Sequence, residues 1–190
     1  QGVGALATVM VAIPFLVVAG VFVNYGGEPV AFTVMPWLKT AGVDLSFGYY
    51  LDELSILMAL IVTGVGTLIH VYSIGYMHGD PGFYKFFMFL NLFIFAMLNL
   101  VLGDNLLVTF LGWEGVGACS YFLIGFWFGD MEKAKAAQKA FVANRIGDFA
   151  FLVAIFICWT STIDPATGMG SLKYTDLALS GINAQWVGIL

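Results

Sequence analysis

Five apolar stretches follow one another along this chain, and each is long enough to cross a bilayer as an α-helix. Hydrophobic residues make up 61% of the sequence and charged residues 10%, where soluble domains carry about 25%. Backbone polar groups inside lipid must bond within their own segment, as they do in a helix. We therefore predict an all-α polytopic membrane protein, with helices at residues 3–24, 52–76, 83–102, 105–128 and 136–159.

The segments between these stretches differ in character. Residues 25–51 contain several Gly and Pro and short alternating runs, which predict a β-hairpin in water. Gly103 and Asp104 form a tight connection, so the helices on either side should be antiparallel neighbours, with Asp104 capping the second. Residues 160–185 are expected to form a loop without a regular element, and residues 186–190 the start of another membrane helix.

Lysines are distributed unevenly between the two sets of connections. Counting helix ends, four lysines lie on the side of the connections after the second and fourth stretches, and two lie on the other side. The first set is Lys85, Lys133, Lys135 and Lys139, and the second is Lys39 and Lys173. The positive-inside tendency then predicts that the first set faces the cytoplasm or its equivalent, and that the hairpin and the 160–185 loop face outward.

Glu114 lies inside the fourth apolar stretch, roughly 14 Å along the predicted helix and near the middle of the membrane. An ionised carboxylate there costs at least about a few kcal/mol, so it normally has a partner, a water-filled cavity or a bound proton. Small neighbouring residues leave room for close helix packing or for water. Glu114 therefore indicates ion or proton handling. The alternative is a structural glutamate that pairs with a neighbouring helix.

A second polar group lies on the fifth stretch. Arg145 and Asp148 are three residues apart, so they share a helix face and can pair. Asn144 lies on an overlapping face, and Gln138 and Lys139 are nearer the cytoplasmic end. This pattern is typical of a polar path that enters from that end and reaches the middle of the membrane. A static ion pair that fastens this helix to its neighbours would give the same pattern.

The second stretch carries Thr63, Thr67 and His70 on one predicted helix face. A histidine can relay protons because its ordinary pKa is about 6.5. It can equally be an interfacial anchor that bonds to a neighbouring helix. Thr67 and His70 are therefore kept as candidates for a proton path.

Other chemistry finds no support. The basic residues are scattered, which argues against nucleic-acid binding. No Walker loop, dinucleotide fingerprint, HExxH or metal-ligand spacing is present. Cys119 and Cys158 fall inside predicted helices and are interpreted as apolar packing residues.

Two long motifs resemble a known family. Residues 111–127 read LGWEGVGACSYFLIGFW and residues 138–156 read QKAFVANRIGDFAFLVAIF. With YYLDELSILM at 49–58 and LIHVYSIGYM at 68–77, they resemble the NuoL-type antiporter-like subunit of respiratory complex I. We expect a fragment of a longer protein, covering about the second to sixth membrane helices of an antiporter-like bundle.

The resemblance implies roles for individual residues. Glu114 falls on the essential membrane glutamate of the family, whose usual partner is a lysine on the helix expected beyond Leu190. Arg145 and Asp148 fall on the charged pair of the NRIGD motif, and His70 falls on a membrane histidine.

The implied function is proton translocation across a bacterial plasma membrane or a mitochondrial inner membrane, driven by NADH oxidation and quinone reduction in other subunits. No cofactor is expected in this chain, and flavin, iron–sulfur clusters and quinone are expected in partner subunits. The implied partners are other membrane-arm subunits, notably the neighbouring antiporter-like subunit, and the lipid bilayer.

Two alternatives remain. One is the large subunit of a multisubunit Na⁺/H⁺ antiporter, although the GWEGVG wording at residues 112–117 favours complex I. The other is a structural spacer of the membrane arm. Clustered charges argue against a spacer, since apolar residues would fill that role at lower cost.

Overall fold

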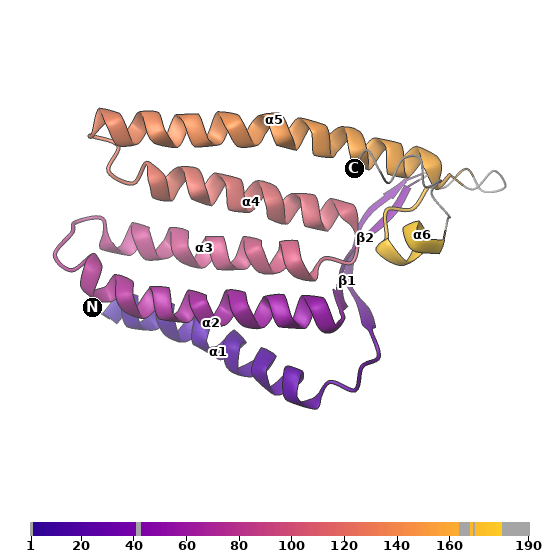
Figure 1. Cartoon of the computed structure of the whole chain (residues 1–190), viewed down its shortest axis with the longest axis horizontal. Coiled ribbons are helices and arrows are strands. Elements are labelled where there is room, and N and C mark those ends of the chain that lie inside the picture. Colours follow the sequence, from indigo (N-terminus) through magenta and orange to yellow (C-terminus); the bar gives the residue numbers. More distant parts are fainter. Residues whose placement is uncertain (1, 41–42, 164–167, 169, 180–190) are drawn as a thin grey trace.

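The computed structural model describes residues 2–40, 43–163, 168 and 170–179, and its long helices lie in a row (Figure 1). Consecutive helices pack side by side, and the first also packs against the third. The helices are α1 Gly2–Asn24, α2 Glu53–Tyr76, α3 Phe83–Leu102, α4 Leu106–Ile124 and α5 Met131–Ser161. All five are long and apolar enough to span a membrane, which confirms the predicted fold class.

Side chains set where several helices begin. Asp52 and Ser55 form a reciprocal capping box at the start of α2. At the start of α4 the Asn105 side chain accepts the N–H groups of Leu107 and Val108 at 3.1 and 3.0 Å. The prediction that Asp104 caps this helix is therefore wrong. Asp104 instead accepts a hydrogen bond from the Asn105 amide at 2.6 Å, which orients the true cap.

The helix boundaries on either side of the α4–α5 turn differ from the prediction. α4 ends at Ile124, before the predicted residue 128, because Gly125 closes its last turn. α5 begins at Met131, before the predicted residue 136, because Asp130 accepts the Glu132 N–H at 3.0 Å. That bond, together with Lys133, holds the pKa of Asp130 below its usual range. The first turn of α5 was not predicted because residues 131–135 include three charged side chains and do not continue the apolar stretch.

The predicted hairpin is confirmed. Strands β1 Val30–Thr40 and β2 Val43–Leu51 pair in antiparallel fashion at one end of the helix row, which we call the hairpin end (Figure 1). The turn between α3 and α4 holds it there. The Asp104 N–H donates to the Gly48 carbonyl at 3.2 Å, and the Asn105 amide donates to the Ser46 carbonyl at 2.9 Å.

The segment after α5 was predicted to be a loop without a regular element, and the structure differs from this in one respect. It contains a short helix, α6 Tyr174–Leu179, which is tied to the same α3–α4 turn. The Leu106 N–H donates to the Leu172 carbonyl, and the Tyr174 N–H donates to the Asp104 carbonyl, both at 3.1 Å. The predicted loop residues 180–185 and the predicted helix start at 186–190 lie outside the described residues.

α3 and α4 approach each other closely. A Cβ added at Gly112 of α4 would lie 2.7 Å from the Leu100 Cα of α3, which is closer than such atoms come in real structures. A Cβ added at Gly115 would lie 2.8 Å from the Ala96 Cβ. These glycines therefore let the two backbones touch, as small residues do between membrane helices.

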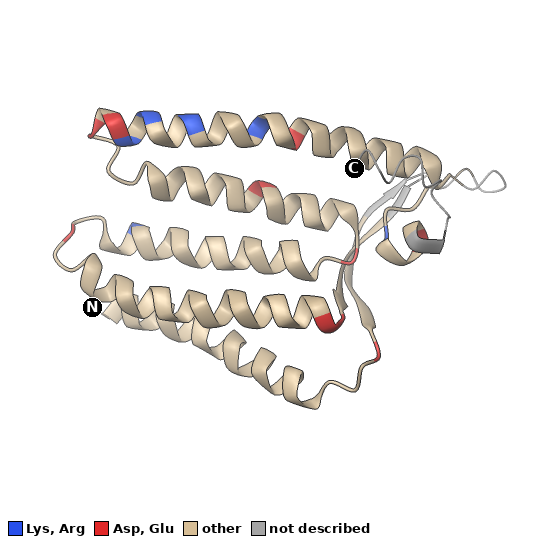
Figure 2. Ribbon diagram, viewed as in Figure 1, with Lys and Arg blue, Asp and Glu red and all other residues tan. Residues whose placement is uncertain are grey.

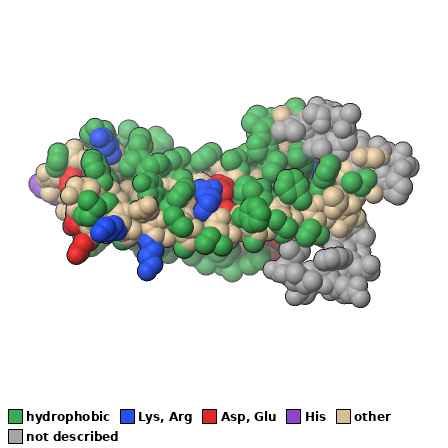
Figure 3. Space-filling view, turned by 90° about the horizontal axis from the view of Figure 1, so that it is seen from above, with side chains coloured by type: hydrophobic (Ala, Val, Ile, Leu, Met, Phe, Trp, Pro, Cys, Tyr) green, Lys and Arg blue, Asp and Glu red, His purple; other side chains and the backbone are tan. Residues whose placement is uncertain are grey.

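Charged residues lie near the ends of the helices, along the first half of α5 and in the middle of α4 (Figure 2). Lys85 near the start of α3, and Lys133 and Lys135 near the start of α5, lie at the end opposite the hairpin, which we call the lysine end. Lys173 directly precedes α6, at the hairpin end. The view from above shows a mostly apolar surface, interrupted near its middle by adjacent basic and acidic side chains (Figure 3). Those charges belong to α4 and α5 and form the site described next.

Candidate functional site

A salt bridge joins the middle of α4 to the middle of α5. The Arg145 Nη1 donates to the Glu114 Oε2. The side chain of Glu114 is 24% exposed and that of Arg145 is 46% exposed within this chain. Glu114 thus has a basic partner among the described residues. The resemblance implied a lysine beyond Leu190 for this role, and that expectation stays a prediction.

The same guanidinium reaches a second carboxylate. Arg145 Nη1 lies 3.5 Å from the Asp148 Oδ2, so the pair predicted from the three-residue spacing forms. Asp148 is buried, with 4% of the residue exposed. One cation therefore lies between Glu114 of α4 and Asp148 of its own helix. Two carboxylates and one guanidinium carry a formal charge of −1, because 2 negative charges exceed 1 positive charge.

This excess charge decides what the cluster can do. An unbalanced negative charge among apolar side chains is unfavourable, and binding one proton or one more cation removes it. The Glu114–Arg145–Asp148 cluster is therefore a candidate site for binding a proton or a cation.

Trp113 belongs to this site, although it was not among the predicted site residues. Its indole N–H donates to the Asp148 Oδ1 at 2.6 Å. The ring packs edge-on against Phe151, with 6.3 Å between ring centroids and an interplanar angle of 86°. One signal was available, because an indole N–H within an apolar stretch needs an acceptor and Trp113 directly precedes the membrane glutamate. Which acceptor it finds depends on how α5 faces α4.

The other predicted site residues lie elsewhere. Lys139 is exposed on α5, about 9 Å from Arg145 toward the lysine end, and forms no ion pair within the described part of the chain. His70 is buried on α2, which packs against α1 and α3, so it is two helices away from α4 in the row. Thr67 donates to the Thr63 carbonyl of its own helix at 2.8 Å.

His70 has its own surroundings, separate from the charged cluster. Its Nδ1 lies 2.7 Å from the Gly66 carbonyl, which can only accept, so Nδ1 carries a proton. Its Nε2 is buried and has no hydrogen-bond partner among the described residues. The ring packs against Phe87 of α3, with 5.9 Å between centroids. The structure thus does not join His70 to Glu114.

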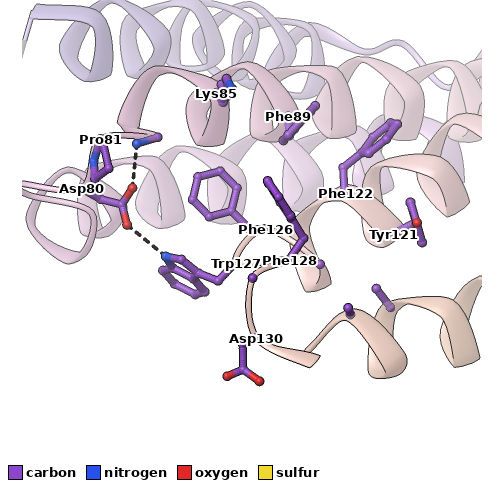
Figure 4. Close-up of a pocket in the computed structure, with 15 residues that line it drawn as sticks. Asp80, Pro81, Lys85, Phe89, Tyr121, Phe122, Phe126, Trp127, Phe128 and Asp130 are labelled. Carbon is purple, nitrogen blue, oxygen red and sulfur yellow. Dashed lines mark hydrogen bonds between the residues drawn. The ribbon is translucent and has the colours of Figure 1, made fainter. Parts of the chain in front are cut away.

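A cavity of about 640 Å³ opens at the lysine end, between the start of α3 and the α4–α5 turn (Figure 4). Six of its fifteen lining residues are aromatic, among them Phe126 and Trp127. The Trp127 N–H donates to the Asp80 Oδ2 at 2.9 Å. None of the predicted site residues lines this cavity, so it is separate from the charged cluster.

Family models match two parts of the chain. Residues 37–87 match the N-terminal region of chain 5 of NADH-ubiquinone oxidoreductase (complex I). Residues 103–189 match the transmembrane region of the NADH:quinone oxidoreductase/Mrp antiporter family. The second match contains every residue of the charged cluster.

Curated relatives agree with these matches. NADH-quinone oxidoreductase subunit L of Mycobacterium tuberculosis H37Rv is 47% identical over 157 residues, which are 83% of this chain and 24% of the relative. Subunit L of Escherichia coli K12 is 40% identical over 176 residues, which are 93% of this chain and 26% of the relative. The chain thus spans about a quarter of the length of the curated relatives that it matches.

Solved structures share the fold at low sequence identity. A chain of the archaeal membrane-bound sulfane sulfur reductase aligns with a TM-score of 0.75 at 18% identity, covering 93% of this chain and 34% of that one. A chain of the Mrp complex from a Dietzia species aligns with a TM-score of 0.70 at 22% identity, covering 95% and 20%. These likenesses establish the antiporter-like fold alone.

Proposed function

The chain belongs to the subunit L (chain 5) family of NADH:quinone oxidoreductase, and on this premise we propose that it translocates protons across an energy-transducing membrane. The observation that carries the proposal is the charged cluster between α4 and α5. A glutamate and a buried aspartate share one arginine in the middle of two membrane helices, and their summed charge favours binding one proton.

The Na⁺/H⁺ antiporter alternative is weaker. The likeness to the Mrp complex concerns a fold that both classes share. The relatives that share 40 to 47% identity carry the name NADH-quinone oxidoreductase subunit L. A pure spacer is weaker still, since holding charges within a membrane costs free energy that an apolar contact would avoid.

Partners follow from the same premise. The proposal includes other membrane-arm subunits as partners, notably the neighbouring antiporter-like subunit, and lipid around the apolar helix faces. This chain would carry no redox centre, and flavin, iron–sulfur clusters and quinone would belong to partner subunits. Its place is the bacterial plasma membrane or the mitochondrial inner membrane.

Proton uptake tests the function directly. Proteoliposomes that hold the intact complex should acidify their lumen when NADH and a quinone are supplied on the outside, because electron transfer in other subunits drives the cluster. The rate is expected to be the same with Na⁺ and with K⁺ as the only added cation. A pH-sensitive dye measures it. An absolute requirement for Na⁺ would favour the antiporter instead.

We also propose that the hairpin end faces outward and the lysine end faces the cytoplasm or matrix. The lysines at the end opposite the hairpin support this orientation. Glu28→Cys and Lys135→Cys, both at exposed positions, should react with an impermeant maleimide from opposite sides of sealed vesicles. Labelling of both from the same side would contradict the topology.

A further inference from the structure

Four side chains form a closed ring across α4 and α5. The Trp113 indole bonds Asp148, Asp148 contacts Arg145, and Arg145 bonds Glu114. Trp113 and Glu114 are consecutive residues, so the backbone itself closes the ring. Successive side chains leave a helix about 100° apart, which lets one stretch of α4 reach both ends of the Arg145–Asp148 pair.

We propose that Trp113 is a positioning residue that keeps Asp148 ionised, so that Glu114 is the carboxylate that gains and loses the proton. This inference rests on the proposed function and assigns different roles to the two carboxylates, Glu114 and Asp148. It assigns to the indole a role that acts through Asp148 and not on the proton itself.

The two carboxylates are unequal in the structure. The Asp148 Oδ1 accepts the indole N–H at 2.6 Å, and its Oδ2 lies 3.5 Å from the Arg145 Nη1, so both oxygens face hydrogen-bond donors. Such donors stabilise a carboxylate more than the neutral acid. The hydrogen bond found for Glu114 among the described residues comes from Arg145.

This inequality sets the direction of exchange. When Glu114 binds a proton it becomes neutral, and Arg145 keeps Asp148 as its anionic partner. When Glu114 releases the proton, it regains the arginine. In this proposal Asp148 keeps the indole N–H of Trp113 in both states. The negative charge in excess is thereby confined to one titrating position.

Two substitutions separate the hydrogen bond from packing. Trp113→Phe keeps an aromatic ring against Phe151 but removes the donor. Trp113→His loses the second ring but keeps a five-membered ring that can carry an N–H at the equivalent position. With rates normalised to assembled complex, Trp113→Phe should lower proton pumping by about tenfold, while Trp113→His stays within about threefold of the wild type.

Trp127→Phe is the matched control. It removes the other indole-to-carboxylate bond of the described chain, Trp127 to Asp80 at the lysine end (Figure 4). Its pumping rate should stay near that of the wild type. A loss in Trp113→His equal to or larger than that in Trp113→Phe would show that ring bulk matters, and would overturn the inference. So would wild-type pumping by Trp113→Phe.

A double substitution shows whether the effect passes through Asp148. Asp148→Asn removes the charge that the indole stabilises, so adding Trp113→Phe should cause little further loss. Additive losses would overturn the inference. Glu114→Gln, measured in parallel, tests the proposed function separately. If it pumps normally, the proposed function fails, whereas failure of the tryptophan series alone leaves that function standing.

Discussion

Glu114→Gln is expected to lower proton pumping by at least about tenfold while the complex still assembles. Glutamine keeps the size of glutamate and can still accept a hydrogen bond from Arg145, but it cannot bind and release a proton at pH 7. Quinone reduction should fall with pumping, since the proposed function couples the two. NADH oxidation with a quinone, dye-reported proton uptake and the amount of assembled complex together measure the effect.

Glu114→Asp is the matched control. It keeps the titratable group and shortens the side chain by one methylene, so Arg145, half exposed and able to move, can still reach it. This variant should retain much more activity than the glutamine variant. If Glu114→Gln pumped at the wild-type rate, the glutamate would be structural, and the proton site would have to be sought elsewhere.

Arg145→Gln is expected to be the most damaging substitution in the cluster. It removes the one described cation that contacts both Glu114 and Asp148, and two carboxylates then remain together in the middle of the helices. Removing one member of a buried charge pair typically costs about 3–5 kcal/mol, and the partial exposure of Arg145 reduces that figure. We expect several-fold less assembled complex, measured by native electrophoresis, and little pumping by what remains.

Two further variants show whether charge is the cause. Lys135→Gln removes one positive charge from the same helix, near its exposed lysine end, and should leave assembly unchanged. Arg145→Gln combined with Asp148→Asn removes one charge of each sign and should restore much of the assembly without restoring pumping. Equal assembly defects in the single and double variants would mean that the shape of the arginine, not its charge, holds α5 in place.

Much of the fold could be predicted because a long apolar stretch is a reliable sign of a membrane helix. Each apolar stretch corresponds to one helix, and the Gly- and Pro-containing segment 25–51 forms the hairpin. The errors lie where polar side chains act locally. Asn105, not its neighbour Asp104, caps α4. Asn and Asp are both preferred at N-cap positions, so the sequence alone does not distinguish them. α6 was not predicted because it is short and is held by backbone hydrogen bonds to the α3–α4 turn, which is distant in the sequence.

The site was predictable residue by residue but not contact by contact. Glu114 is conspicuous as a lone acid in an apolar stretch, and the spacing of Arg145 and Asp148 predicts their pairing. The contacts of Trp113 with Asp148 and of Arg145 with Glu114 were missed. They depend on the rotation of α4 and α5 about their axes, and α4 is apolar nearly all round, so no stripe indicates which side faces its neighbour.

The glycine contacts between α3 and α4 have a mechanical consequence for the charged cluster. Gly112 and Gly115 bring the two helices together so closely that a side chain at either position would clash with α3. α3 and α4 therefore form a tightly packed pair, and Glu114 belongs to one of its two helices. On the other side of α4, the half-exposed Arg145 side chain of α5 contacts both Glu114 and Asp148, so a change of its partner would leave the α3–α4 packing intact.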